Sequence, residues 1–147
     1  MKPRILLRIA AFFTFAVAVG HTIGHFTRKM TTDPTDKQVI NQMEIHKFNF
    51  NGAMRSWDDF YEGLSLDISL TLVILTVLLW IIGNSTHRYP LFCFKLLWPV
   101  LVCFIGFTIT GFLYFFLVPA ICTLVASVMV MVAMFQLRRQ VNIRNVL

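Results

Sequence analysis

Charged residues are scarce in this chain of 147 residues. They make up 14% of the sequence, against about 25% in a typical soluble domain, whereas 57% of the residues are hydrophobic. This imbalance excludes intrinsic disorder and argues against a water-soluble fold. A membrane-spanning helix needs about 20 mostly apolar residues, so a chain of this length has room for four of them.

Cysteine is also sparse. The three cysteines, Cys93, Cys103 and Cys122, lie in or beside apolar segments, and no two of them form a Cys-x-x-Cys pair. An even-numbered set would indicate a disulfide framework, and a close pair would indicate redox chemistry. The sequence therefore argues against a four-helix membrane thiol oxidoreductase, which needs a dithiol pair.

Acidic residues are missing from most of the chain. All seven lie between residues 33 and 67, so that residues 26–67 carry a net charge of −2 and the remainder carries +8. The basic residues stand mostly where apolar runs end, which is typical of topology signals and not of a face that grips phosphates. We therefore expect no nucleic-acid partner.

Four apolar stretches predict membrane-spanning helices, the second of them within a helix that begins near residue 57: residues 5–25, 64–82, 96–117 and 120–137. Residues 91–137 contain one formal charge, and a single helix of that length would measure about 70 Å, more than twice the hydrocarbon thickness of a bilayer. The run must fold back, and Val118-Pro119 is the predicted turn. Pro99 is expected to kink its helix without dividing it.

The basic residues predict the orientation of these helices. Eight of them flank helix ends on one side: Lys2, Arg4, Arg8, Arg88, Lys95, Arg138, Arg139 and Arg144. By the positive-inside rule, both termini are cytoplasmic. We expect an all-α, multi-pass four-helix bundle forming a single membrane domain over residues 1–147, placed in a bacterial inner membrane. An alternative is that the basic start and Ala16-Val17-Ala18 belong to a cleaved signal peptide.

The first loop, residues 26–56, is longer than a typical connection and is predicted to lie on the outer side. Apolar residues and one lysine recur in it at helical spacing: Val39, Ile40, Met43, Lys47 and Phe50. This pattern predicts a short amphipathic helix on the membrane surface. Asn51-Gly52 is typical of a turn, and Ser56 is expected to cap a helix that begins at Trp57.

Polar side chains follow one face of the first two predicted spans. His21 and His25 are one helical turn apart, on a stripe that also contains Thr14 and Arg28. The second helix carries a similar stripe with Tyr61 at its edge, made of Asp58, Glu62, Ser65, Ser69 and Thr76. Because polar groups facing lipid are costly, both stripes are expected to face protein.

The alternating directions of the helices bring these residues to one membrane level, at the outer end of the bundle. The third span adds a predicted inward line of Pro99, Cys103, Gly106, Thr110 and Tyr114. Our leading hypothesis is a polar site that binds a hydrophobic or amphipathic small molecule, with general acid/base chemistry on it as an extension. The predicted catalytic residues are His21, His25, Glu62 and Tyr114, and the predicted ligand contacts are Thr14, Asp58, Tyr61, Ser65 and Thr110.

Two other hypotheses come from the same residues. A divalent metal could be held by His21 and His25 with Glu62 or Asp58, whereas haem is not expected because both histidines share one helix. Alternatively, the cluster fastens helices in a non-catalytic assembly protein, with membrane lipid and a second copy of the chain as partners. Asp67, inside the second apolar run, is expected to find a partner, either a hydroxyl in the third or fourth span or a second copy of the chain, because a carboxylate facing lipid is costly.

Two motifs carry a resemblance to known proteins. His21-Thr22-Ile23-Gly24-His25 and the segment from Ser56 to Gly63 together resemble those of small bacterial four-helix membrane proteins that have no assigned activity. The similarity covers mainly these two segments and their spacing. It implies the four-span fold and that the two motifs belong together, and it implies no reaction.

Overall fold

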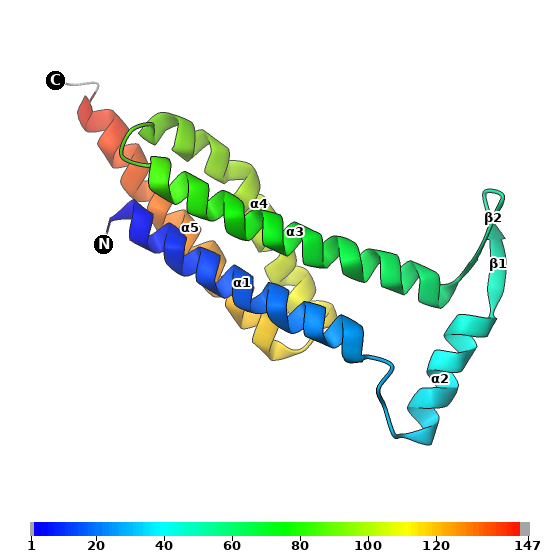
Figure 1. Ribbon diagram of the computed structural model, residues 1–147. Coiled ribbons are helices and arrows are strands. Elements are labelled where there is room, and N and C mark those ends of the chain that lie inside the picture. Colours follow the sequence, from blue (N-terminus) through cyan, green and yellow to red (C-terminus); the bar gives the residue numbers. More distant parts are fainter. Residues whose placement is uncertain (1, 145–147) are drawn as a thin grey trace. The chain divides into compact units, whose positions relative to one another are not determined.

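The chain is almost entirely helical, which confirms the all-α prediction (Figure 1). A computed structural model describes residues 2–144, and 83% of these described residues are helical. In chain order, the elements are α1 (Pro3–Thr27), α2 (Pro34–Ile45), β1 (Lys47–Phe50), β2 (Ala53–Ser56), α3 (Trp57–Ser85), α4 (Pro90–Tyr114) and α5 (Leu117–Arg144).

Four of these helices are long and apolar enough to cross a membrane: α1, α3, α4 and the part of α5 up to Asn142. The predicted spans 5–25, 64–82 and 120–137 lie within α1, α3 and α5, whereas the predicted span 96–117 runs past the end of α4. The predicted turn at Val118-Pro119 is wrong by a few residues, because α4 ends at Tyr114 and α5 begins at Leu117. Proline is tolerated in the first turn of a helix, where backbone N–H groups lack an intrahelical acceptor. Pro119 therefore lies in the first turn of α5, and α4 continues through Pro99.

The chain forms two compact units, one made of residues 1–17 and 72–147 and the other of residues 18–71. The first unit contains the start of α1, the end of α3, and all of α4 and α5. Its core is apolar and draws on all four helices, and its largest fully buried side chains include Leu7, Leu79, Leu97, Phe104, Val130 and Leu137.

Helices α4 and α5 pack closely in this unit. A Cβ added at Gly111 would lie 3.1 Å from both Cα and Cβ of Ala120. One turn earlier in α4, the Thr108 hydroxyl donates to Thr123 Oγ1 of α5 over 3.3 Å and lies 3.4 Å from Ser127 Oγ. Small residues and shared hydroxyls are the usual means by which apolar helices associate in membranes.

The second unit contains α2 and a β-hairpin. Asp33 caps α2 by accepting from the backbone N–H groups of Thr35 and Asp36. The hairpin turns at Asn51-Gly52, as predicted, and both residues have positive φ, 51° and 88°, which a two-residue type I′ turn requires. Pairing runs from Lys47 opposite Ser56 to Phe50 opposite Ala53.

A short helix is present in the first loop, as predicted, but it ends earlier than its pattern indicated. Val39, Ile40 and Met43 lie in α2, whereas Lys47 and Phe50 lie in strand β1. The Asn-Gly turn favours a hairpin strongly, and Phe48 and Phe50 alternate so that both reach Phe60 of α3, with ring centroids 5.9 and 5.6 Å apart. The strand pairing and these aromatic contacts replace the last helical turn.

Candidate functional site

The start of α3 is fixed by a reciprocal cap. The Asp59 backbone N–H donates to Ser56 Oγ over 3.1 Å, and the Ser56 N–H donates to Asp59 Oδ2 over 2.8 Å. This is a capping box with aspartate in the third position. It confirms Ser56 as the cap of a helix beginning at Trp57, and it uses Asp59 for structure. The neighbouring Asp58 is thereby held on a fixed first turn.

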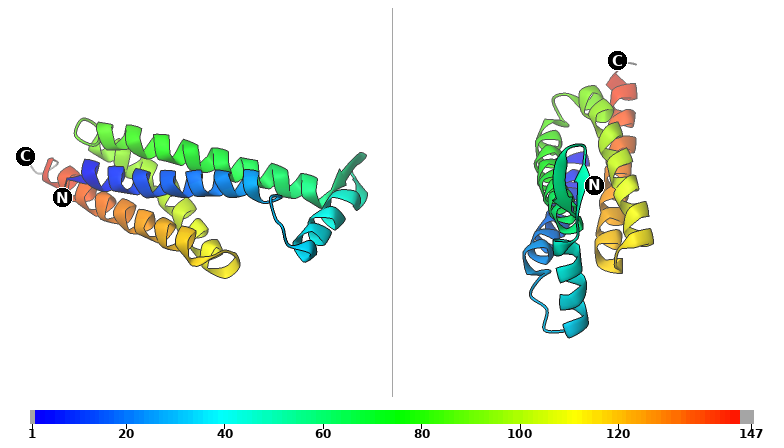
Figure 2. Two further views of the ribbon diagram at one scale, coloured as in Figure 1. Left: turned by 60° about the horizontal axis from the view of Figure 1, so that its bottom comes forward. Right: turned by 90° about the vertical axis from the view of Figure 1, so that its right-hand side faces the viewer.

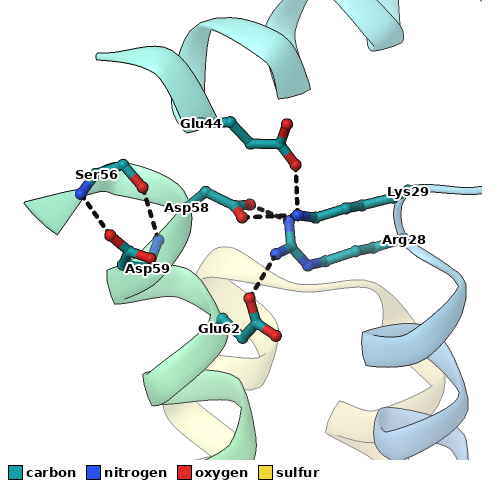
Figure 3. A network of polar contacts seen from close by, with 7 residues as sticks. All are labelled: Arg28, Lys29, Glu44, Ser56, Asp58, Asp59 and Glu62. Carbon is teal, nitrogen blue, oxygen red and sulfur yellow. Dashed lines mark hydrogen bonds and ion pairs between the residues drawn. The ribbon is translucent and has the colours of Figure 1, made fainter. Parts of the chain in front are cut away.

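Asp58 is the centre of an ion-pair network within residues 18–71 (Figure 3). Its side chain is 8% exposed, with Arg28 Nη1 2.6 Å from Oδ1 and Lys29 Nζ 2.8 Å from Oδ2. Oδ1 makes no regular hydrogen bond, so the contact with Arg28 is a charge pair. Lys29 also contacts Glu44 of α2, and Arg28 Nη2 lies 3.9 Å from Glu62. The network joins the end of α1, α2 and the start of α3.

The two cations of the network are stabilised in their charged forms. The Asp58 carboxylate raises the pKa of Arg28 above its ordinary value, with burial acting against it. Hydrogen bonds to Asp58 and Glu44 raise the pKa of Lys29 in the same way. The Arg28 guanidinium also lies 4.8 Å from the centre of the Tyr61 ring, a cation–π contact that fixes its plane.

His21 is engaged between α1 and α3. Its Nε2 lies 3.1 Å from both the backbone O and the Oγ of Ser65. A carbonyl oxygen can only accept, so the bond to Ser65 O needs a proton on Nε2. One residue further on, the Thr22 hydroxyl donates to Ser69 Oγ over 3.2 Å. The predicted stripes of the two helices therefore meet here through His21 and Ser65, whereas Ser69 contacts Thr22, which lies outside the predicted stripe of α1.

His25 differs from His21 because it has no such partner. Its side chain is buried, with 8% of the residue exposed. Its Nδ1 is the only buried side-chain nitrogen within the described residues 18–71 that has no hydrogen-bond partner. The ring packs edge-on against Phe26, with centroids 4.9 Å apart.

Three predicted site residues lie in the other unit. Thr14 is buried, and its hydroxyl donates to Ala10 O of its own helix over 2.8 Å. Thr110 and Tyr114 lie on the exposed side of α4, so the predicted inward line through them is wrong. The buried face of α4 includes Phe104, Thr108 and Gly111. Thr110 tolerates exposure because its hydroxyl donates to Gly106 O over 3.0 Å.

The predicted metal set is not assembled. Over residues 2–144, no three His, Cys, Asp or Glu side chains come together in a way that could hold a metal ion. His21 bonds Ser65, while Asp58 and Glu62 face Arg28. The cations in this cluster are the Arg28 guanidinium and the Lys29 ammonium, which neutralise the carboxylates that a metal would need.

Asp67 was expected to find a polar partner. Its side chain is exposed on α3, and its carboxylate makes no hydrogen bond or ion pair with any residue of its own unit, 18–71. Within residues 18–71, the one side-chain hydrogen bond at this position is made to the backbone: the Thr71 hydroxyl donates to Asp67 O over 2.7 Å.

Sequence reasoning missed Lys29 and Glu44 and gave Arg28 no role beyond the stripe of α1. The signal for Arg28 was present, because it stands one turn after His25, where a side chain of the first span could reach Asp58 and Glu62. Lys29 and Glu44 lie in a polar loop and a polar helix, where charged residues are ordinary. Nothing local marks them as partners of a buried carboxylate.

No protein-family model, curated protein or solved structure matches the chain. The likeness of its two motifs to small bacterial four-helix membrane proteins stays a prediction. Function must be inferred from the residues and their geometry.

Proposed function

We propose that the protein is a multi-pass inner-membrane protein, with both termini cytoplasmic, whose residues 18–71 bind an amphipathic small molecule against His25. The observation that carries this is the buried, unpartnered Nδ1 of His25. Buried polar groups are hydrogen-bonded in the large majority of cases, and an exception calls for a specific cause. A bound molecule with a hydroxyl or amide group supplies the missing partner.

The surroundings of His25 favour an amphipathic ligand, with one apolar end and one polar end. Ile23 and Phe26, on the same stretch of α1, are exposed and apolar. Arg28 and Glu62 provide charge of both signs one turn further along, and Glu62 is half-exposed. An apolar tail would lie along α1, and a polar head would meet His25 and the ends of the ion-pair network.

Proton transfer to such a ligand is the chemical extension of this proposal. Imidazole exchanges protons near neutral pH and is the commonest general base. His25 is the better candidate for that role, because His21 Nε2 is already occupied by Ser65. Glu62 is the carboxylate with the most freedom to act with it, since Asp58 is held by Arg28 and Lys29.

Native mass spectrometry of protein purified in mild detergent tests the proposal. The wild type should carry a small molecule, and His25→Leu should lose it while keeping its helical circular dichroism. His46→Gln is the matched control, because His46 is exposed in the same unit and should leave occupancy unchanged. A ligand-free wild type, or equal occupancy in folded His25→Leu, would contradict the proposal.

A second candidate function is non-catalytic membrane assembly. The observation that favours it is that His21 and Thr22 of α1, and Arg28 directly after α1, each contact a polar residue of α3. On this account His21→Ala and His25→Ala would both lower thermal stability, and no bound molecule would be found in either variant or in the wild type.

A further inference from the structure

Arg8 of α1 has only neutral partners. Its Nη2 donates to Asn84 Oδ1 of α3 over 3.4 Å, and its guanidinium carbon lies 4.6 Å from the centre of the Trp80 ring. Its Nε is buried and has no hydrogen-bond partner. All three residues belong to the same compact unit. The donor capacity of this guanidinium is therefore mostly unused.

No carboxylate side chain of this unit can complete the pairing. Every aspartate and glutamate of the chain lies between residues 33 and 67, so residues 1–17 and 72–147 contain none. Arg28 in the other unit shows the contrast, since it pairs with Asp58 at 2.6 Å. A guanidinium presents a planar fork of donors that matches carboxylate or phosphate oxygens. No side chain of its own unit therefore supplies the counter-charge of Arg8.

The position of Arg8 indicates where that counter-charge comes from. The start of α1, the connection from α3 to α4 and the end of α5 lie at one end of this unit, in both views (Figures 1 and 2). Other basic residues belong to the same segments: Lys2, Arg4, Arg88, Arg138 and Arg139. Clusters of lysine and arginine next to membrane helices attract anionic headgroups.

We propose that Arg8, Asn84 and Trp80 form a binding site for the phosphate group of an anionic phospholipid. Trp80 holds the guanidinium in one plane, and the Nη donors of Arg8 that Asn84 does not occupy donate to the phosphate oxygens. Asn84 accepts from Arg8 through Oδ1, which leaves its amide N–H groups free to donate to the same phosphate. Both Asn84 and Trp80 are exposed, so the site is open to a headgroup.

Native mass spectrometry with added lipids tests this site. Phosphatidylglycerol and phosphatidylcholine with identical acyl chains are titrated into delipidated protein. The wild type should prefer phosphatidylglycerol by about tenfold, and Arg8→Gln should lose that preference, the change expected when a charge-assisted hydrogen bond is removed. Arg4→Gln is the matched control, since Arg4 is exposed on the same helix and its loss removes the same charge. It should reduce phosphatidylglycerol binding by about fivefold at most, the effect of one surface charge near a headgroup layer, and leave a preference for phosphatidylglycerol.

Further variants separate the site from general attraction and from folding. Asn84→Leu should weaken phosphatidylglycerol binding about threefold without changing the charge, roughly the effect of one neutral hydrogen bond. This variant keeps the test decisive if Arg8→Gln does not fold. A thermal shift with inorganic phosphate alone, lost in Arg8→Gln, would identify free phosphate as the ligand of the same site. Equal weakening by Arg4→Gln and Arg8→Gln, or no preference in the wild type, would overturn the proposal.

Discussion

Removal of the Asp58 carboxylate should open residues 18–71 locally. Among the ion pairs of this unit, Asp58 is the only carboxylate within 3 Å of both Arg28 and Lys29, and its side chain is 8% exposed. Asp58→Asn preserves size and removes the charge, which leaves Arg28, 14% exposed, with Glu62 at 3.9 Å as its nearest acid. Breaking one side of a buried ion pair costs about 3–5 kcal/mol. Because Arg28 keeps Glu62 and Tyr61, we expect about 2–3 kcal/mol.

Amide hydrogen exchange measures this loss of local stability separately for each segment of the chain. A loss of about 2–3 kcal/mol corresponds to roughly 30- to 150-fold faster exchange. The increase should appear in α2 and the hairpin, residues 34–56, and not in α4 or α5, because local units open independently. The matched control is Glu44→Gln, which breaks the contact between Lys29 and Glu44, each 42% exposed, and should cost less than about 1 kcal/mol.

The two variants also differ in their response to salt. High salt screens the exposed pair more than the buried one, so it should remove most of the effect of Glu44→Gln and little of that of Asp58→Asn. Equal exchange in the two variants, or acceleration spread evenly over all helices, would refute the view that Asp58 holds this unit together.

Three further predictions concern packing and helix caps. Gly111→Ala should destabilise the pairing of α4 and α5 by about 1–3 kcal/mol because its Cβ would meet Ala120 at 3.1 Å, whereas Gly106→Ala, with open space around it, should be neutral or stabilising in detergent unfolding. Asp59→Ala should lower the melting temperature by removing the capping box, and Asp67→Ala should not; the opposite ranking would contradict the observed contacts. The N–H groups of Asp36 and Thr35 hold the pKa of Asp33 below its ordinary value, so this carboxylate stabilises α2 above about pH 4 and the contribution is lost as pH falls through its lowered pKa. Circular dichroism should show that loss, and Asp33→Asn should abolish the pH dependence.

Local signals in the sequence predicted the parts of the fold that depend on neighbours along the chain. The apolar runs are long enough that only helices could hold them in a bilayer. Three of the four predicted runs lie within one helix, and the third, 96–117, runs past the end of α4 at Tyr114. Asn51-Gly52 and Ser56 were predicted correctly because a hairpin turn and a helix cap each depend on a few adjacent residues.

The faces of the apolar helices could not be predicted in the same way. In α4, polarity suggested that Thr110 and Tyr114 face inward. However, this helix carries apolar residues on every face, and a threonine hydroxyl can donate to the backbone of its own helix. Phe104 and Gly111 are buried instead, because shape and close approach decide packing between apolar helices.

The partners of the candidate site lay beyond sequence reasoning for a related reason. His21 and Ser65 lie on the two polar stripes that were predicted to face protein, so their contact agrees with that prediction. The pairing of Lys29 with Asp58 and Glu44 joins three segments separated in sequence, and no spacing rule links them. Arg28 accounts for the failure of the metal-site prediction, because its guanidinium faces Asp58 and Glu62, the carboxylates that were predicted as metal ligands.

The most direct test of the central claim is an experimental density map of the protein extracted from its native membrane with lipids retained. The proposal predicts density for a bound molecule within hydrogen-bond distance of His25 Nδ1, extending along α1 past Ile23 and Phe26. A well-resolved map in which His25 contacts only protein side chains would contradict it.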